Sequence, residues 1–275
     1  MKSFLRYLIL TIALVSFNLL AGELELAEQL NQSQIHHQPI PLVSLIQPEL
    51  SIAQAYKIQR YYVQSQLGND QPAGFKSGLT SAATQNKFNV NQPVSGILFT
   101  KGDLSGIKTI KLAKFDQLRL ETEIGFEIGT AIEKTLSDEK QLKQHIKAIF
   151  PAIELPEVNF TKQPTGIDII AANIGAKAYI KGKAVTDFTL MDLNTLSVTL
   201  TKDGKIVNSG KGDEVLNDQW QAALWLVNQL VAQGWSLMPG QFLITGVIGK
   251  MVKAEVGHYQ ADFGKLGKIT VAIIP

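Results

Sequence analysis

Two glutamates near the middle of the chain have a spacing that suits a metal ion. Glu121 and Glu123 lie in a stretch whose residue types alternate from Leu118 to Ile128. Because alternate side chains of a strand share a face, both carboxylates project from one face, about 7 Å apart at Cα. Carboxylates this close repel each other unless a cation relieves them, and their oxygens favour Mg²⁺, Mn²⁺ or Ca²⁺. The pair predicts a divalent-cation site, with a solvated strand face as the alternative.

A third carboxylate stands in an apolar segment further along the chain. Glu154 is flanked by Ile153 and Leu155, with Pro151 and Pro156 close by. A lone acid in such surroundings costs free energy unless it is paired or bound to a metal. An edge position beside Pro156 would instead leave the carboxylate in water. Glu154 is therefore a further candidate metal ligand.

One lysine has the surroundings of a proton-transfer group. Lys76 lies between Gly74 and Gly78 in a short apolar stretch, which indicates a close backbone approach and a placed ammonium. A lysine near a metal has a lowered pKa and can move protons. The competing interpretation is a surface lysine in a turn.

The elements that must hold these residues follow from helix caps, apolar periodicity and one strong turn signal. We expect helices at residues 23–34, 51–67 capped by Ser51, 138–149 capped by Ser137, and 218–234 capped by Asp218. We expect strands at residues 118–128, 197–201, 205–208, 242–247 and 268–274, with a hairpin at Asp203-Gly204. This pattern favours an α+β fold, with a small helical region at 23–80 and a β-rich, metal-binding catalytic domain at 81–275.

Residues 1–22 have the pattern of a secretory signal. Lys2 and Arg6 precede an apolar run over residues 7–21, and acidic residues begin at Glu23. The run is about 15 residues long, short of the roughly 20 that a spanning helix needs. We expect export to the bacterial periplasm, with membrane contact only through this signal, which is cleaved or, as the alternative, kept as an uncleaved anchor.

Composition excludes several classes of function. The chain has 275 residues, with 26 Lys and Arg against 24 Asp and Glu. Two of the positive charges belong to the signal, so the remainder is close to neutral and a nucleic-acid partner is not indicated. There is no cysteine, which excludes disulfides, zinc-thiolate sites, iron–sulfur clusters and a cysteine nucleophile.

Motifs spread over about 200 residues share their order with a known family. They lie at Ala55–Gln59, Gly74–Thr80, Glu121 with Glu123, Pro151–Glu154, Asp168–Asn173, Gly210–Gly212, Ala222–Leu226, Pro239-Gly240 and Leu243–Gly246. In these motifs the chain resembles the 2-keto-4-pentenoate hydratase family (2-hydroxypenta-2,4-dienoate hydratases) of the fumarylacetoacetate hydrolase superfamily. The resemblance implies the fold of that superfamily, a mixed β-sheet sandwich or roll with a small helical N-terminal part.

The resemblance also implies a reaction and its main residues. Glu121, Glu123 and Glu154 would hold one Mg²⁺ or Mn²⁺, which acts as a Lewis acid. Lys76 would be the general acid and base. The substrate would be a small 2-keto or 2-hydroxydienoic acid. Water would add to a 2-hydroxy-2,4-dienoate to give a 4-hydroxy-2-oxo acid.

Further residues and an assembly state follow from the same resemblance. Thr245 and Gly246 match a substrate-binding turn of the family. Asn173 matches a substrate-binding loop beside the site, and Asp168 in the same loop has a structural or a catalytic role. Members of the family often form rings, so a homo-oligomer is expected.

Departures from the pattern of the family keep other functions open. Pro93–Gly96 lacks an acid that the family often has there, and Leu216–Gln219 replaces its Leu-Gly-His-Pro. These changes indicate an altered substrate, or an exported, non-catalytic protein that binds a keto acid. A 4-oxalocrotonate-type decarboxylase would use the same metal site. A C–C hydrolase of the superfamily needs a water-activating histidine, and the sequence context of the four histidines does not supply one.

Overall fold

The computed structural model describes residues 22–275. The expected secretory signal lies outside the described residues, apart from Gly22. The chain divides into two compact units. One unit holds the residues up to Gly68 together with Phe160–Asn173, and the other holds Asn69–Asn159 together with Ile174–Pro275. In the described part of the chain, no helix combines the length and the apolar character needed to cross a bilayer.

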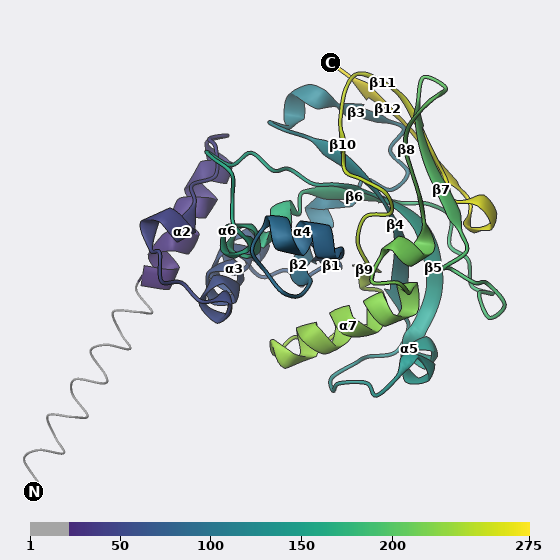
Figure 1. Ribbon diagram of the computed structural model, residues 1–275, viewed down its shortest axis with the longest axis horizontal. Coiled ribbons are helices and arrows are strands. Elements are labelled where there is room, and N and C mark those ends of the chain that lie inside the picture. Colours follow the sequence, from purple (N-terminus) through teal and green to yellow (C-terminus); the bar gives the residue numbers. More distant parts are fainter. Residues whose placement is uncertain (1–21) are drawn as a thin grey trace, which may run out of the picture. The chain divides into compact units, whose positions relative to one another are not determined.

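The N-terminal unit is built from helices (Figure 1). Residues 22–35 are helical, followed by α2 (Val43–Ile46), α3 (Ile52–Leu67) and α6 (Gly166–Ala171). The helices predicted at 23–34 and 51–67 are confirmed, and Ser51 caps α3 in a capping box with Gln54. Apolar residues from all four segments share one core, made of Leu26, Ala27, Leu30, Val43, Leu50, Ile58 and Ala171.

A seven-stranded sheet runs through the C-terminal unit (Figure 1). Its order is β2-β1-β9-β4-β5-β6, and β10 pairs with β4 off this path. The strands are β1 (Gly74–Gly78), β2 (Val94–Leu98), β4 (Arg119–Ile128), β5 (Ile146–Leu155), β6 (Ala178–Lys181), β9 (Phe242–Ile244) and β10 (Val252–Lys253). β1 and β9 run parallel, and the other pairs are antiparallel.

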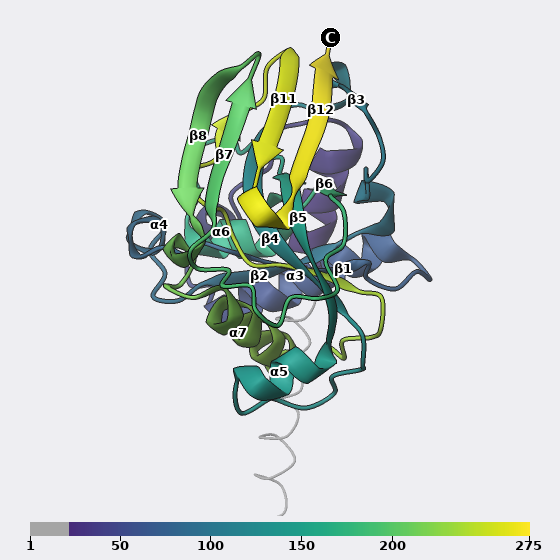
Figure 2. The same ribbon diagram turned by 90° about the vertical axis from the view of Figure 1, so that its right-hand side faces the viewer.

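A five-stranded sheet forms a second layer (Figure 2). Its order is β3-β12-β11-β7-β8, with β3 (Thr109–Lys111), β7 (Ser197–Lys202), β8 (Lys205–Lys211), β11 (Gly257–Asp262) and β12 (Lys268–Ile274). The predicted β7–β8 hairpin turns at Asp203-Gly204, where both residues have positive φ. Asn208 of β8 donates to Thr122 of β4, so the two sheets are layered. Together they form the mixed β sandwich expected from the sequence.

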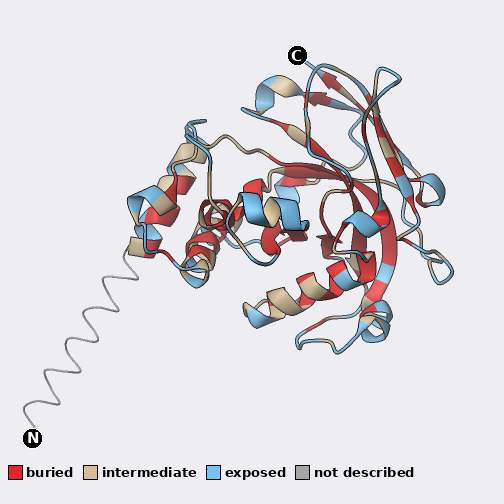
Figure 3. Cartoon of the chain, in the orientation of Figure 1, coloured by how far each residue is buried: buried red, intermediate tan, exposed pale blue. Residues whose placement is uncertain are grey.

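Helices and short 3₁₀ turns complete the C-terminal unit. They are α4 (Ala82–Lys87), α5 (Glu139–His145), α7 (Gln219–Ala232), and 3₁₀ turns at Thr100–Gly102, Leu112–Lys114, Asn173–Gly175, Gly212–Glu214 and Gly264–Leu266. The helix predicted from Asp218 is confirmed, and the Asp218 side chain accepts from two backbone amides of its first turn. Trp220 of α7 packs edge-on against Phe126 of β4. Figure 3 shows the buried side of α7 and the buried central strands.

Several boundaries differ from the sequence-based expectations: β9 ends at Ile244 instead of residue 247, and β8 continues to Lys211 instead of residue 208. The helix predicted at 138–149 is wrong in its second half: it is capped by Asp138, it ends at His145, and β5 begins at Ile146. The apolar run after His145 pairs along the whole of β4, and that pairing outweighs the helix signal. Residues 69–80 do not belong to the N-terminal unit as expected, because residues 74–78 form an inner strand of the large sheet. That unit instead includes Phe160–Asn173.

Candidate metal centre

The pairing of β4 with β5 brings the three predicted glutamates together. Glu121 lies directly opposite Glu154, and Glu123 lies opposite Ala152. Opposite residues of an antiparallel pair point to the same side of the sheet, so all three carboxylates share one face. One oxygen from each carboxylate lies within 4.8 Å of the others. The register of two neighbouring strands therefore builds the cluster.

Burial decides between the alternatives for these glutamates. Glu123 and Glu154 are 0% exposed, and Glu121 is 8% exposed. The interpretation of β4 as a solvated strand face is therefore wrong. The edge position considered for Glu154 is also wrong, because β5 lies between β4 and β6. Carboxylates this deeply buried need compensating charge or ligands.

Lys76 belongs to the same cluster. It sits on β1, between β2 and β9, and is 2% exposed. Its Nζ pairs with Oε1 of Glu154 and lies 3.4 Å from the carbonyl oxygen of Ile174. Across β9, Ile244 lies opposite both Lys76 and Gly125, which places the lysine on the carboxylate face. The alternative of a surface lysine in a turn is wrong.

The charges of the cluster perturb one another strongly. Burial, followed by the charge of Glu154, raises the pKa of Glu121 to about 8. Burial, followed by the charges of Glu154 and Glu121, raises the pKa of Glu123 well above its usual range. Burial acts to lower the pKa of Lys76, but the three carboxylates outweigh it and the pKa is raised. The lowered lysine pKa expected beside a bound metal stays a prediction.

The unpaired oxygens of the cluster fit a hard divalent cation. Oε1 of Glu123 and Oε2 of Glu154 are buried and have no hydrogen-bond partner among the described residues. The other oxygen of each is held by the protein, Oε2 of Glu123 by the Gly246 amide and Oε1 of Glu154 by Lys76. When all three carboxylates are ionised, as metal ligands must be, Lys76 balances one negative charge and a divalent cation would balance the other two. An all-oxygen donor set with this charge suits Mg²⁺ or Mn²⁺.

The turn after β9 brings Gly246 to the cluster, and its predicted contact with a substrate stays a prediction. The Gly246 amide donates to Oε2 of Glu123 at 2.6 Å. Its φ of +119° favours glycine, and a Cβ at this position would lie 2.6 Å from Oγ1 of Thr80. Any side chain here would push the turn away from Glu123.

The side chain of Thr245 makes its hydrogen bonds within the protein. Its buried hydroxyl lies 2.7 Å from Oε1 of Gln219 and 3.2 Å from the carbonyl oxygen of Ile124. The hydroxyl proton is therefore used within the protein, toward α7 and β4. These contacts support the turn that carries Gly246, and the predicted contact of Thr245 with a substrate stays a prediction.

Asp168 and Asn173 belong to the N-terminal unit. The Asp168 carboxylate accepts hydrogen bonds from the amide and hydroxyl of both Ser44 and Thr165, at 2.8–2.9 Å. These contacts tie α6 to α2 and give Asp168 a structural role. Asn173 is buried and has a φ of +54°. Its predicted contact with a substrate stays a prediction.

Sequence reasoning missed two residues around the cluster. Ile174 presents its carbonyl oxygen to Lys76 from a φ of +53°, which a β-branched residue rarely adopts. Gln219 is fully buried and bonds to Thr245, although the first position of a helix is usually exposed. No local pattern marks either residue, because both contacts join segments far apart in the sequence.

Comparisons with known proteins agree with this architecture. Residues 72–273 match the fumarylacetoacetate (FAA) hydrolase C-terminal family. The chain is 30% identical over 251 residues to the 2-keto-4-pentenoate hydratase of Paraburkholderia phymatum, covering 89% of this chain and 94% of that protein. It is 26% identical over 248 residues to the 2-keto-4-pentenoate hydratase of Paraburkholderia xenovorans, covering 89% and 92%.

A solved structure shares the fold over nearly the whole chain. It is the 4-oxalocrotonate decarboxylase from Pseudomonas putida G7, complexed with magnesium and adipate, at a TM-score of 0.85 and 24% identity. The match covers 92% of this chain and 97% of that one. With the family match over residues 72–273, these likenesses show that the chain belongs to the fumarylacetoacetate hydrolase family.

Proposed function

We propose that this chain is a divalent-metal-dependent hydro-lyase that adds water to a 2-hydroxy-2,4-dienoate to give a 4-hydroxy-2-oxo acid. The observation that carries the proposal is the buried cluster of Glu121, Glu123, Glu154 and Lys76. Relatives named 2-keto-4-pentenoate hydratase, matched over 89% of the chain, support the substrate class.

Glu121, Glu123 and Glu154 would hold the ion, as the donor set and the unpaired oxygens indicate. Bound there, Mg²⁺ or Mn²⁺ would supply Lewis-acid polarisation of the 2-oxygen and the carboxylate of the substrate. Magnesium in the complex of the Pseudomonas putida decarboxylase supports this choice of metal. Either of these two ions, Mg²⁺ or Mn²⁺, would satisfy the proposal.

Lys76 would move the protons of the reaction. Its Nζ is held between Glu154 and the Ile174 carbonyl, so its position is fixed before a substrate arrives. As a general acid, Nζ would protonate the dienoate carbon chain during ketonisation. As a general base, it would take a proton from the water that adds to C4. The burial of Lys76 would keep bulk water from competing for these protons.

A second candidate is a 4-oxalocrotonate-type decarboxylase. The chain is 25% identical over 236 residues to the 4-oxalocrotonate decarboxylase of Pseudomonas sp. CF600, and it shares the fold of the solved decarboxylase. Both reactions develop negative charge on the 2-oxygen of a keto acid, and the same cluster would serve either. If the cluster binds metal but neither substrate is converted, the protein is a non-catalytic keto-acid-binding protein.

Product identification separates these candidates. The purified protein is incubated with 2-hydroxypenta-2,4-dienoate and Mg²⁺, Mn²⁺ or chelator, while the ultraviolet absorbance of the dienoate is followed. Metal-dependent formation of 4-hydroxy-2-oxopentanoate is the expected result. Release of CO₂ from 4-oxalocrotonate, with no hydration of the dienoate, would establish the decarboxylase instead.

We further propose that the protein is exported to the periplasm and forms a homo-oligomer. Export rests on the charged and apolar pattern of residues 1–22, and the oligomer rests on the family resemblance. Cell fractionation and analytical ultracentrifugation test these two points.

A further inference from the structure

A buried hydrogen-bond chain leads from the start of α7 to the metal cluster. Gln219 is 0% exposed, and both ends of its side-chain amide are engaged. Its Nε2 donates to the carbonyl oxygen of Gly212 at 2.7 Å, and its Oε1 lies 2.7 Å from the hydroxyl of Thr245. The next residue, Gly246, donates its amide to Glu123. Two hydrogen bonds, one from Thr245 to Gln219 and one from Gly246 to Glu123, therefore connect Gln219 with a candidate metal ligand.

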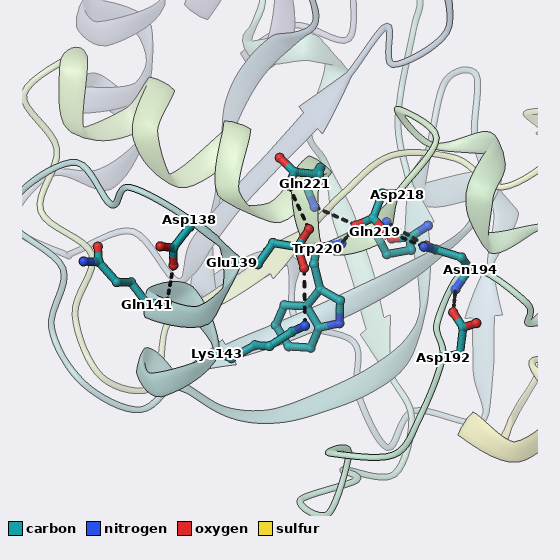
Figure 4. Close-up of polar contacts among 10 residues, drawn as sticks. All are labelled: Asp138, Glu139, Gln141, Lys143, Asp192, Asn194, Asp218, Gln219, Trp220 and Gln221. Atoms are coloured by element: carbon teal, nitrogen blue, oxygen red, sulfur yellow. Dashed lines mark hydrogen bonds and ion pairs between the residues drawn. The ribbon is translucent and has the colours of Figure 1, made fainter.

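Gln219 is itself held in place by its surroundings. Figure 4 shows its backbone amide donating to Oδ1 of Asn194, at 3.0 Å. Nδ2 of Asn194 in turn donates to Asp218, the residue that caps α7. The Gly212 carbonyl belongs to a tight turn, where a Cβ on Gly212 would lie 1.9 Å from the carbonyl oxygen of Leu193. Gln219 therefore presents a fixed acceptor to Thr245.

The far end of the same turn is also held by a buried amide. Oδ1 of Asn208 accepts from the amide of Lys250 at 2.9 Å, and its Nδ2 donates to the carbonyl oxygen of Ile248. The segment 245–250 is thus fixed from both sides. Of the two anchors, Gln219 is the one bonded directly beside Gly246.

We propose that Gln219 is a positioning residue that, through Thr245, holds the Gly246 amide against Oε2 of Glu123. The consequence is specific to one carboxylate oxygen. With Oε2 held by the amide, Oε1 of Glu123 is left without a partner and is presented to the ion. This inference rests on the proposed function, because it takes the three glutamates as metal ligands.

The test uses Gln219→Met, which keeps the length of the side chain and removes both polar ends. Thr245→Val removes the hydroxyl at nearly constant shape, whereas Thr245→Ser keeps it. The matched control is Gln221→Met, because Gln221 lies on the same helix but is exposed and bonds to Glu139. Two quantities are measured on each full-length protein: amide hydrogen exchange at Gly246 without metal, and the Kd for Mn²⁺ by calorimetry.

In Gln219→Met and Thr245→Val we expect the Gly246 amide to exchange about fivefold faster, the factor for losing one ordinary hydrogen bond. We expect Mn²⁺ to bind roughly 10- to 100-fold more weakly, as when support of a metal ligand is lost. Thr245→Ser and Gln221→Met should match the parent in both quantities. If Gln219→Met does not fold, the Thr245 pair carries the test.

A merely structural role for Gln219 would lower the Tm and leave both quantities unchanged in the folded variants. That result overturns the inference, and so does faster exchange with an unchanged Kd for Mn²⁺. A parent protein that binds no Mn²⁺ would refute the proposed metal site, and with it the presentation of Glu123 to an ion. Exchange at Gly246 would still show separately whether Gln219 holds the turn.

Discussion

Nζ of Lys76 pairs with Oε1 of Glu154, although 78 residues separate them in the sequence. Both side chains are almost fully buried. The pair leaves Oε2 of Glu154 without a hydrogen-bond partner among the described residues. One oxygen of Glu154 therefore serves the proton-transfer group, and the other is available to a metal. This division couples the two halves of the proposed mechanism through a single carboxylate.

Glu123→Gln should weaken metal binding strongly without unfolding the protein. Burial and the nearby carboxylates raise the pKa of Glu123, so its charged form is disfavoured in the fold, and glutamine imitates the neutral form. We expect the Kd for Mn²⁺ to rise at least about 100-fold, since an ionic ligand is lost, while the Tm of the chelated protein stays the same or rises. Glu127→Gln is the control, because Glu127 lies on the same strand but pairs with exposed Lys147. Unchanged Mn²⁺ affinity in Glu123→Gln would remove this residue from the ligand set.

Lys76→Met should keep the metal and lose the turnover. In the chelated protein, Glu154 would be left buried without its cation, which costs about 3–5 kcal/mol when one partner of a buried pair is removed. Saturating Mg²⁺ should restore most of this stability, because the ion replaces the lost charge. Thermal unfolding with and without Mg²⁺ measures the effect. Lys147→Met, which breaks an exposed pair with Glu127, should show no comparable metal dependence. Full turnover by Lys76→Met would contradict its proton-transfer role.

The stability of the chelated protein should fall as the pH rises from about 4.5 to 8. The pKa of Glu121 is raised from its ordinary value of 4.5 to about 8 in the fold, so the native state binds more protons than the unfolded state in this window. The slope of the unfolding free energy with pH is then negative. Chemical denaturation at several pH values, with chelator and with Mg²⁺, checks the sign. A chelated protein that gains stability over this range would argue against the close approach of the carboxylates.

Asp168→Asn should destabilise the N-terminal unit and leave the metal site unchanged. Four donor groups converge on the Asp168 carboxylate, and the amide of asparagine would turn a donor toward one of them. We expect a loss of about 1–3 kcal/mol, the cost of an unsatisfied buried polar group. Urea unfolding and Mn²⁺ calorimetry on the same variant separate the two effects. A weakened Mn²⁺ affinity at unchanged stability would return Asp168 to the site.

Local sequence patterns predicted the helices and strands of this protein better than they predicted which strands pair with each other. The spacing of Glu121 and Glu123 placed both carboxylates on one face, because the side chains of a strand alternate. The position of Glu154 opposite Glu121 depends on the register of β4 and β5, which no local pattern encodes. The helix predicted through residue 149 was wrong for the same reason: the long pairing with β4 decides the state of the residues after His145.

The roles of side chains were predicted less well than their positions. Gly246 and Thr245 were both placed in a turn beside the site, and only the contacts of Thr245 with Gln219 and Ile124 show that its hydroxyl supports the turn. The left-handed backbone of Ile174 could not be foreseen, because isoleucine disfavours this conformation. Such a conformation persists only where the surrounding structure holds it. The Ile174 side chain packs over Gly78, where a Cβ would lie 2.9 Å from Cγ2 of Ile174.

The most direct test of the proposed function is a titration with Mn²⁺ in the presence of 2-hydroxypenta-2,4-dienoate. The protein is first stripped of metal with a chelator, which is then removed. Metal occupancy and the loss of dienoate absorbance are followed in the same sample, and the product is identified. We expect one Mn²⁺ per chain, hydration that rises in step with occupancy, and 4-hydroxy-2-oxopentanoate as the product, with none of these in Glu123→Gln. Hydration that persists in chelator, or a filled site that never hydrates the dienoate, would contradict the proposed function.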